Sequence, residues 1–161
     1  MRKAPLVGIM LVLACSPIAT GATDDDFHEV VDFEVTLKTL SVALEANDFS
    51  AIDAEKIVIV HGTVSTMSFL DTKRQSYTVL LELVAGEWLD LDEVKSYRCL
   101  VVFQGPAFYT LIPRRPPRGS TAAVIGEASR VLVIARVLEP VTTELGENMW
   151  LLAGIDIRSL D

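Results

Sequence analysis

Side chains suited to binding an anion gather in one proline-rich segment of this chain. Arg114, Arg115 and Arg118 are interleaved with prolines, and Lys73 and Arg74 add two cations in an expected turn. Guanidinium groups bind carboxylate or phosphate oxygens through paired hydrogen bonds. Proline restricts the backbone that presents them. These five residues are therefore candidates for an anion-binding site.

An aromatic residue close to the basic segment adds a flat surface on which a ligand can stack. The full set of candidate ligand-binding residues is Lys73, Arg74, Tyr109, Arg114, Arg115 and Arg118. In the alternative interpretation, the arginines keep a surface loop soluble and pair with nearby carboxylates. Each such surface pair contributes little to stability.

The side chains that enzymes and metal sites use are sparse. His28 and His61 are the only histidines, and neither has a partner at metal-ligand spacing. Cys99 alternates with apolar residues, which indicates a small core residue rather than a nucleophile. The sequence contains no Gly-x-Ser-x-Gly, His-Glu-x-x-His or phosphate-binding glycine loop. We therefore expect no enzymatic activity, no cofactor and no bound metal.

Acidic residues dominate the charge of the chain, which has a formal net charge of -8. The densest carboxylate cluster, Glu87, Asp90, Asp92 and Glu93, does not have the spacing of an EF-hand calcium loop, and we expect a solvated loop there. A negative field repels phosphate backbones. The charge balance therefore predicts that nucleic acid is not a partner.

The first 22 residues have the order of an export signal. Arg2 and Lys3 precede an apolar run over residues 4–14, and small residues follow up to Ala22. Cleavage after Ala22 would leave a periplasmic or extracellular protein. Alternatively, residues 12–15 (Val-Leu-Ala-Cys) resemble a bacterial lipobox, and lipidation of Cys15 would anchor the protein to a membrane. No later segment is long and apolar enough to span a bilayer, so we expect membrane contact only through Cys15.

Residues 23–161 have the length of one domain, in which a helix precedes a series of strands. Apolar residues recur every three or four positions over 28–47, which predicts an amphipathic helix. From Lys56 onward the pattern alternates, which predicts five strands at residues 56–69, 74–84, 96–103, 130–138 and 149–160. Residues 107–112 extend the third strand in this interpretation, and residues 120–128 form a helical turn.

The predicted strands have distinct inner faces. The expected inward residues are Tyr77, Val79, Leu81 and Leu83; Tyr97, Cys99, Val101 and Phe103; Val131, Val133, Ala135 and Val137; and Leu151, Ala153, Ile155 and Ile157. Trp150 is expected on a solvated face. Gly62 interrupts the first strand, as expected where a strand bends sharply. The pattern predicts a mainly β fold, a five-stranded antiparallel barrel of the OB type with an N-terminal helix. A small β-sandwich is the alternative.

Three short stretches carry a resemblance to a known family. They are Leu40–Asn47, Ser50-Ala51 and Lys56–Val64, in which a helix ending at an asparagine leads into a strand of Val-x-Gly-x-Val type. The chain is similar in these stretches to exported bacterial OB-fold proteins of the anticodon-binding-like group. The likeness covers roughly residues 40–157 and implies the barrel. It implies no ligand, because exported members of that group have no generally established one.

These patterns together predict an exported cell-envelope binding module without catalytic activity. Its expected partner is an envelope protein or an anionic glycan, recognised through the barrel face and the basic segment. The alternative function is that of a structural or scaffolding envelope lipoprotein.

Overall fold

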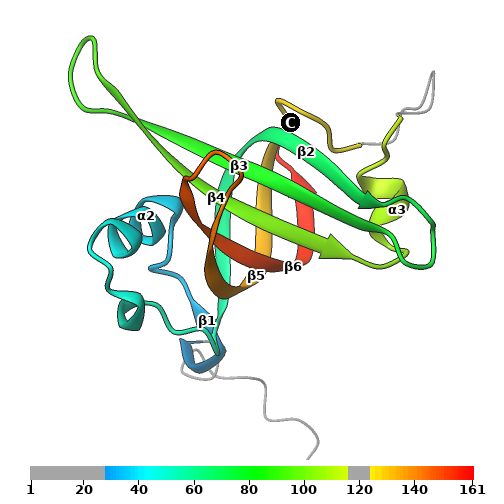
Figure 1. Cartoon of the computed structure of the whole chain (residues 1–161), viewed down its shortest axis with the longest axis horizontal. Coiled ribbons are helices and arrows are strands. Elements are labelled where there is room, and N and C mark those ends of the chain that lie inside the picture. Colours follow the sequence, from blue (N-terminus) through cyan, green and yellow to red (C-terminus); the bar gives the residue numbers. More distant parts are fainter. Residues whose placement is uncertain (1–27, 116–123) are drawn as a thin grey trace, which may run out of the picture.

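A strongly curved sheet forms the centre of the protein in the computed structural model, which describes residues 28–115 and 124–161 (Figure 1). Its long strands are β2 (Ile57–Asp71), β3 (Thr78–Trp88), β4 (Val94–Gln104), β5 (Arg130–Thr142) and β6 (Asn148–Ser159). The shorter elements are β1 (Val31–Asp32), α2 (Leu37–Glu45), the 3-10 turn η1 (Phe49–Ala51) and α3 (Phe108–Leu111). The predicted export signal, residues 1–22, lies outside the described residues.

The long strands close into a barrel in the order β2-β3-β4-β6-β5, and β5 pairs back with β2. Their neighbours are antiparallel except for β4 and β6, which run parallel. This closed five-stranded Greek-key arrangement is the OB-fold. The predicted fold class is therefore confirmed. The β-sandwich alternative is wrong, because the strands form one closed sheet rather than two packed sheets.

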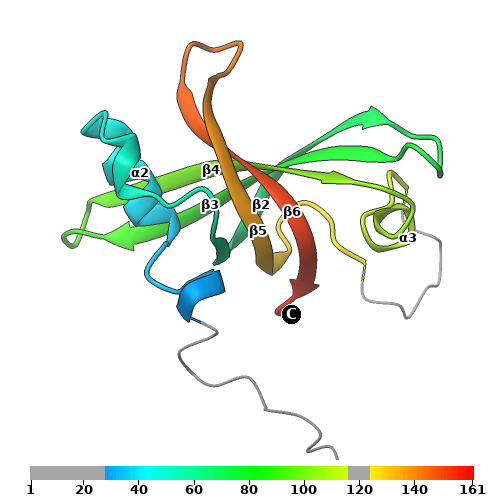
Figure 2. The ribbon, with the colours of Figure 1, turned by 90° about the horizontal axis from the view of Figure 1, so that it is seen from below.

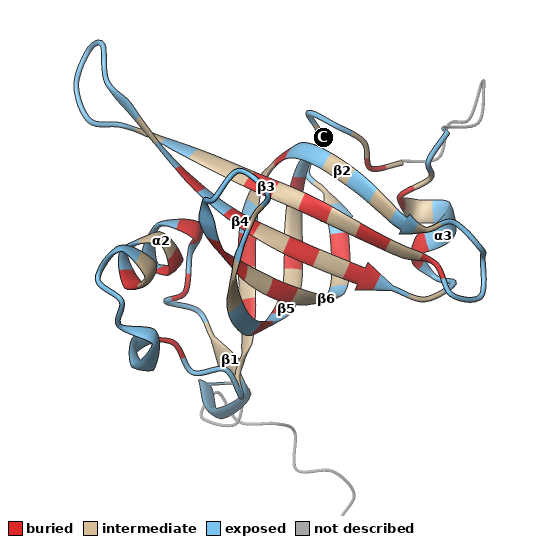
Figure 3. Ribbon diagram, viewed as in Figure 1, coloured by how far each residue is buried: buried red, intermediate tan, exposed pale blue. Residues whose placement is uncertain are grey.

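Buried residues alternate with less buried ones along the long strands (Figure 3), and their side chains form the core of the barrel. The inner faces predicted for β3, β4 and β5 are confirmed, since all their residues are at most 5% exposed. Cys99 is fully buried among them, as expected. Removal of this apolar surface from water is the main force that stabilises the fold.

The first strand bends at Gly62, as the sequence predicts. Residues Ile57 to Thr63 of β2 pair with β5, and residues Thr63 to Asp71 pair with β3. A Cβ atom at Gly62 would lie 3.0 Å from the carbonyl oxygen of Val84. Glycine therefore allows β2 to turn from one side of the barrel to the other without a clash.

The inner face predicted for the last strand is wrong in part. Ile134 pairs with Asp156 and Ala135 with Gly154, so Ile155 is an extra residue that forms a β-bulge in β6. A bulge reverses the alternation of the faces on its two sides. Consequently Trp150 and Leu152 are buried, whereas Ile155 is 48% exposed.

The N-terminal helix is shorter than the predicted range 28–47. Val31 and Asp32 pair in parallel with the start of β2, so the chain is extended there. Thr36 then begins α2 with a capping box, because its side chain accepts a hydrogen bond from the Thr39 amide and the Thr36 amide donates one to the Thr39 side chain. The helix buries Leu37 and Leu40 against the barrel.

Two further predictions about the connection between β4 and β5 need correction. Residues 107–112 do not extend the third strand, because Phe108–Leu111 form the short helix α3. Of the helical turn predicted at 120–128, residues 120–123 lie outside the described residues and residues 124–128 contain no helix.

Gly154 provides a test of the bulged register. A Cβ atom added at Gly154 would lie 2.2 Å from the nearest atom of the Phe103 ring, so the Gly154→Ala substitution forces the ring out of place. We expect a loss of about 1–3 kcal/mol in the free energy of unfolding, the usual cost of overpacking a core. Chemical denaturation measures it.

Gly126→Ala is the matched control, because no atom lies within 4 Å of its Cβ position. Phe103→Leu in the Gly154→Ala background should restore part of the lost stability. Equal stabilities for the two alanine variants would contradict the packing of Gly154 against Phe103.

Candidate functional site

The end of the barrel that carries the β2–β3 turn is held by Tyr77. The Gly105 amide donates a 2.8 Å hydrogen bond to the Tyr77 carbonyl oxygen, and the Tyr77 hydroxyl donates to the Ile112 carbonyl oxygen. Burial raises the pKa of Tyr77, and the nearby Tyr109 adds to the shift, so the phenol keeps its proton. These bonds fix α3 and the residues that follow it beside the turn (Figures 1 and 2).

Two aromatic residues of α3 have opposite roles. Phe108 is buried, and its ring centroid lies 4.9 Å from that of Phe103, so it closes this end of the core. Tyr109 is 41% exposed and packs edge-on against Tyr77, with 5.4 Å between the ring centroids. Its remaining surface is therefore available to a ligand.

Four of the predicted cations lie at this end of the molecule. Lys73 and Arg74 are exposed in the β2–β3 turn, and Arg114 and Arg115 are exposed shortly after α3. Within residues 28–115 and 124–161, no carboxylate lies within ion-pair distance of these four side chains. Arg118 lies outside the described residues. We call the set Lys73, Arg74, Tyr109, Arg114 and Arg115 the basic end.

Asp71 shapes the turn that carries two of these cations. Its carboxylate accepts hydrogen bonds from the Lys73 amide at 2.9 Å and the Ser76 hydroxyl at 2.7 Å. These bonds, with the positive charge of Lys73, lower the pKa of Asp71. The turn therefore keeps its conformation while the Lys73 side chain points into solvent.

The outer face of β3 and β4 is less suited to an anion. It presents Leu80, Leu100 and Val102, together with Arg98. The Arg98 guanidinium lies 3.7 Å from Glu82 and 3.4 Å from Glu147, so two carboxylates offset its charge. Arg98 was not among the residues predicted from the sequence, because its partners Glu82 and Glu147 are distant from it along the chain.

The acidic cluster predicted at the β3–β4 turn divides into two parts. Asp90, Asp92 and Glu93 are exposed, as expected of a solvated loop. Glu87 instead binds Lys38 of α2 at 2.8 Å and accepts a 2.6 Å hydrogen bond from the Tyr97 hydroxyl. The Lys38 bond and then the Tyr97 bond hold the pKa of Glu87 below its usual range.

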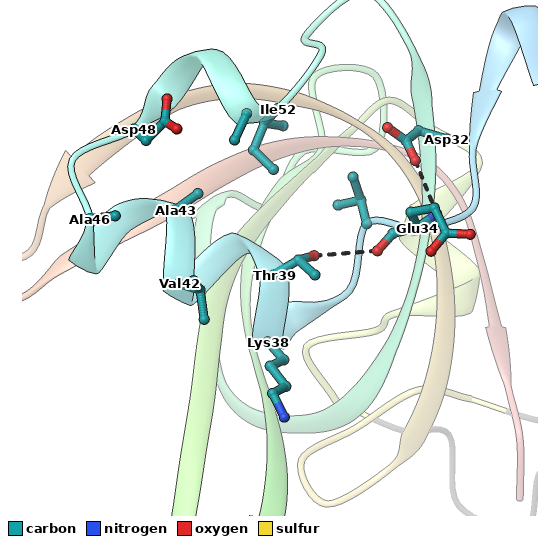
Figure 4. Close-up of a pocket in the computed structure, with 11 residues that line it drawn as sticks. Asp32, Glu34, Lys38, Thr39, Val42, Ala43, Ala46, Asp48 and Ile52 are labelled. Atoms are coloured by element: carbon teal, nitrogen blue, oxygen red, sulfur yellow. Dashed lines mark hydrogen bonds between the residues drawn. The ribbon is translucent and has the colours of Figure 1, made fainter.

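Beside α2 lies a concave surface of about 420 Å³ (Figure 4). Its lining is mainly apolar and also contains the carboxylates of Asp32, Glu34 and Asp48. Lys38 is the one cation among the lining residues, and its ammonium group donates a 2.8 Å hydrogen bond to Glu87. A mainly apolar surface with three carboxylates does not suit a phosphate-bearing ligand.

The histidines and the cysteine considered from the sequence do not form a metal site or a catalytic site among the described residues. His28 packs edge-on against Phe33 with ring centroids 5.5 Å apart, and His61 is exposed on β2. The described part of the chain contains no group of three residues able to hold a metal ion. Burial raises the pKa of Cys99 to about 12, which is opposite to the shift that a nucleophilic thiol requires.

None of the helices formed by the described residues is both long and apolar enough to span a membrane.

No family model and no curated protein matches this sequence. Several solved structures are similar in fold. The N-terminal domain of PriB from Thermoanaerobacter tencongensis shows 12% identity over 65% of this chain and 96% of its own, with a TM-score of 0.41. A small single-stranded DNA-binding protein from Streptomyces coelicolor shows 14% identity over 64% and 92%, with a TM-score of 0.41. The single-stranded DNA-binding protein of Plasmodium falciparum, solved with DNA, shows 18% identity over 65% and 94%, also with a TM-score of 0.41.

These comparisons contradict the predicted function. Single-stranded DNA-binding proteins recur among the similar structures, and the expectation of an exported envelope binding module or scaffolding lipoprotein does not agree with them. The expected periplasmic, extracellular or lipid-anchored location does not agree with these similar structures either. It depended on residues 1–22 and on Cys15, which lie outside the described residues.

The predicted partners need the same correction. An envelope protein or anionic glycan was expected and nucleic acid was excluded, whereas the similar structures include proteins that bind single-stranded DNA. The exclusion relied on the net charge of the whole chain. The fold instead brings four cations to one end, and a ligand responds mainly to charges within about one Debye length, roughly 8 Å at physiological salt.

Glu87 allows a test of how α2 is fixed to the barrel. Because the folded pKa of Glu87 is lowered, its contribution to stability is present above the ordinary value of 4.5 and is lost as pH falls through the folded pKa. Glu87→Gln should therefore lower stability at neutral pH, and the difference from wild type should disappear in acid. Denaturation midpoints between about pH 3 and about pH 7 measure this difference.

Glu93→Gln is the control, because no cation of the described chain lies within ion-pair distance of Glu93. A difference between Glu87→Gln and wild type that stays constant across this pH range would contradict the assigned role of the Lys38–Glu87–Tyr97 contacts.

Proposed function

We propose that this protein is an OB-fold domain that binds single-stranded nucleic acid through its basic end and has no catalytic activity. One observation carries the proposal. The β2–β3 turn and the segment after α3 place four cations, none with an ion-pair partner among the described residues, at the same end of the barrel as a half-exposed tyrosine. Cations that follow a phosphate backbone, combined with an aromatic surface for a base, are the usual elements of single-strand binding.

The position of the basic end in the fold supports this function. The β2–β3 turn joins the first two strands of the barrel, and OB-folds use this connection, with the face of their second and third strands, to bind oligonucleotides. In this chain Glu82 and Glu147 offset the only arginine on that face, Arg98. We therefore place the phosphate contacts at the turn and after α3 rather than across β3 and β4.

The resemblance to the anticodon-binding-like group supports only the part of the proposal that concerns the fold. The strand motif Val60-His61-Gly62-Thr63-Val64 that carries the resemblance spans the bend of β2. We propose that the chain is related to the OB barrels of that group. The nucleic-acid contact is argued from the basic end alone.

Loss of the arginines should weaken binding and reduce its salt dependence. We expect the slope of log affinity against log salt to fall by about 0.7 for each single-strand phosphate contact that Arg114→Ser and Arg115→Ser remove. Tyr109→Ala should cost about 1–3 kcal/mol of binding free energy if a base stacks there. Fluorescence anisotropy with a labelled thymidine oligonucleotide measures both effects.

The matched control is the Arg136→Ser/Arg158→Ser variant, which removes the same charge from exposed positions on β5 and β6. This control should bind as wild type does. The function is contradicted if wild type does not bind the oligonucleotide, or if the two double variants weaken binding equally.

A further inference from the structure

The β3–β4 hairpin projects from the barrel at the end opposite the basic end (Figures 1 and 2). Its tip, residues 88–94, exposes large apolar side chains. Trp88 is 72% exposed, Leu91 is 90% exposed and Leu89 is 52% exposed. Apolar surface gathered at a projecting tip is typical of an interaction site rather than of a solvated loop.

The same tip is strongly acidic. Asp90, Asp92 and Glu93 lie between Leu89 and Val94, and no cation of the described chain lies within ion-pair distance of their carboxylates. The nearby Lys95 does not offset this charge, because it is bound to Glu45 of α2 at 3.1 Å. The tip therefore presents three carboxylates together with its apolar side chains.

The hairpin is braced so that the tip keeps its position. Lys38 and Glu45 of α2 bind Glu87 of β3 and Lys95 of β4, one ion pair on each strand of the hairpin. Within the turn, the Leu89 amide donates a 2.9 Å hydrogen bond to the Glu93 carbonyl oxygen. A tip held in one conformation loses less conformational entropy when it binds.

We propose that the tip of one copy of this chain docks on the basic end of a second copy. The carboxylates of the tip would meet the cations of the basic end, and Trp88 and Leu91 would cover the exposed surface of Tyr109. Within one molecule the two surfaces lie at opposite ends (Figures 1 and 2), so the contact is between molecules. A head-to-tail contact of this kind produces an open chain of copies or a closed ring.

This self-association goes beyond nucleic-acid binding, although both contacts use the basic end. A neighbouring tip and a single strand cannot occupy that end together. Each would therefore displace the other, and the assembled form would be the one that binds nucleic acid poorly.

Charge reversal tests the contact directly. We expect the mass of the wild-type protein in sedimentation velocity to rise with concentration at low salt. Asp90→Lys/Asp92→Lys and Arg114→Asp/Arg115→Asp should each raise the concentration needed for association by at least about tenfold, because close charge pairs dominate such contacts. Combining all four substitutions in one chain restores opposite charges and should return association to near the wild-type concentration.

Glu139→Lys/Glu144→Lys is the matched control, since it makes the same change in net charge at exposed residues outside the tip. It should associate as wild type does, and circular dichroism checks that every variant is folded. Three results overturn the proposal: a monomeric wild type at every concentration, a control as defective as the tip variant, or a folded four-substitution variant that stays monomeric.

The two proposals fail separately. A monomeric wild type that binds the oligonucleotide overturns self-association alone. Association that responds to the charge swap, without oligonucleotide binding, overturns the proposed function alone.

Discussion

The bend of β2 at Gly62 is the constraint on which the rest of the structure depends. The part of β2 before the bend pairs with β5, and the part after it pairs with β3, so this strand joins the two sides of the barrel. A side chain at Gly62 would press on the Val84 carbonyl oxygen, which lies 3.0 Å from the Cβ position. Because β2 turns here, its C-terminal part delivers the turn with Lys73 and Arg74 to one end of the barrel. The hairpin formed by β3, which pairs with β2, and β4 reaches the other end (Figure 1).

Closure of the barrel therefore separates two surfaces of opposite charge. The basic end gathers cations from two connections that lie far apart in the sequence, and the buried Tyr77 holds these connections together. The hairpin tip carries carboxylates and exposed apolar side chains, and α2 braces its base. On the barrel face between them, Glu82 and Glu147 offset the charge of Arg98. The two ends thus present clusters of exposed charges that have no ion-pair partner among the described residues.

Local periodicity predicted much of this fold. Alternation located the five strands and the inner faces of three of them, and it placed Cys99 in the core. It could not predict the inner face of β6, because the bulge at Ile155 arises from pairing with β5 and from the close approach of Gly154 to Phe103. The start of α2 was missed for a similar reason, since Val31 and Asp32 pair with a strand that lies later in the chain. The candidate cations were predicted from the sequence, but their convergence depends on tertiary contacts of Tyr77. The exclusion of nucleic acid relied on the net charge, and a net charge does not describe where charges lie.

The location of the proposed nucleic-acid contact is the central claim, and amide chemical-shift mapping tests it most directly. A labelled sample of the protein is titrated with a thymidine oligonucleotide of about ten nucleotides, within the usual site size of an OB-fold. The account predicts shifts at residues 72–77 and 109–115, and unchanged signals on the outer face at Leu80, Leu100 and Val102. Shifts confined to that outer face, with unchanged signals at the basic end, would contradict it.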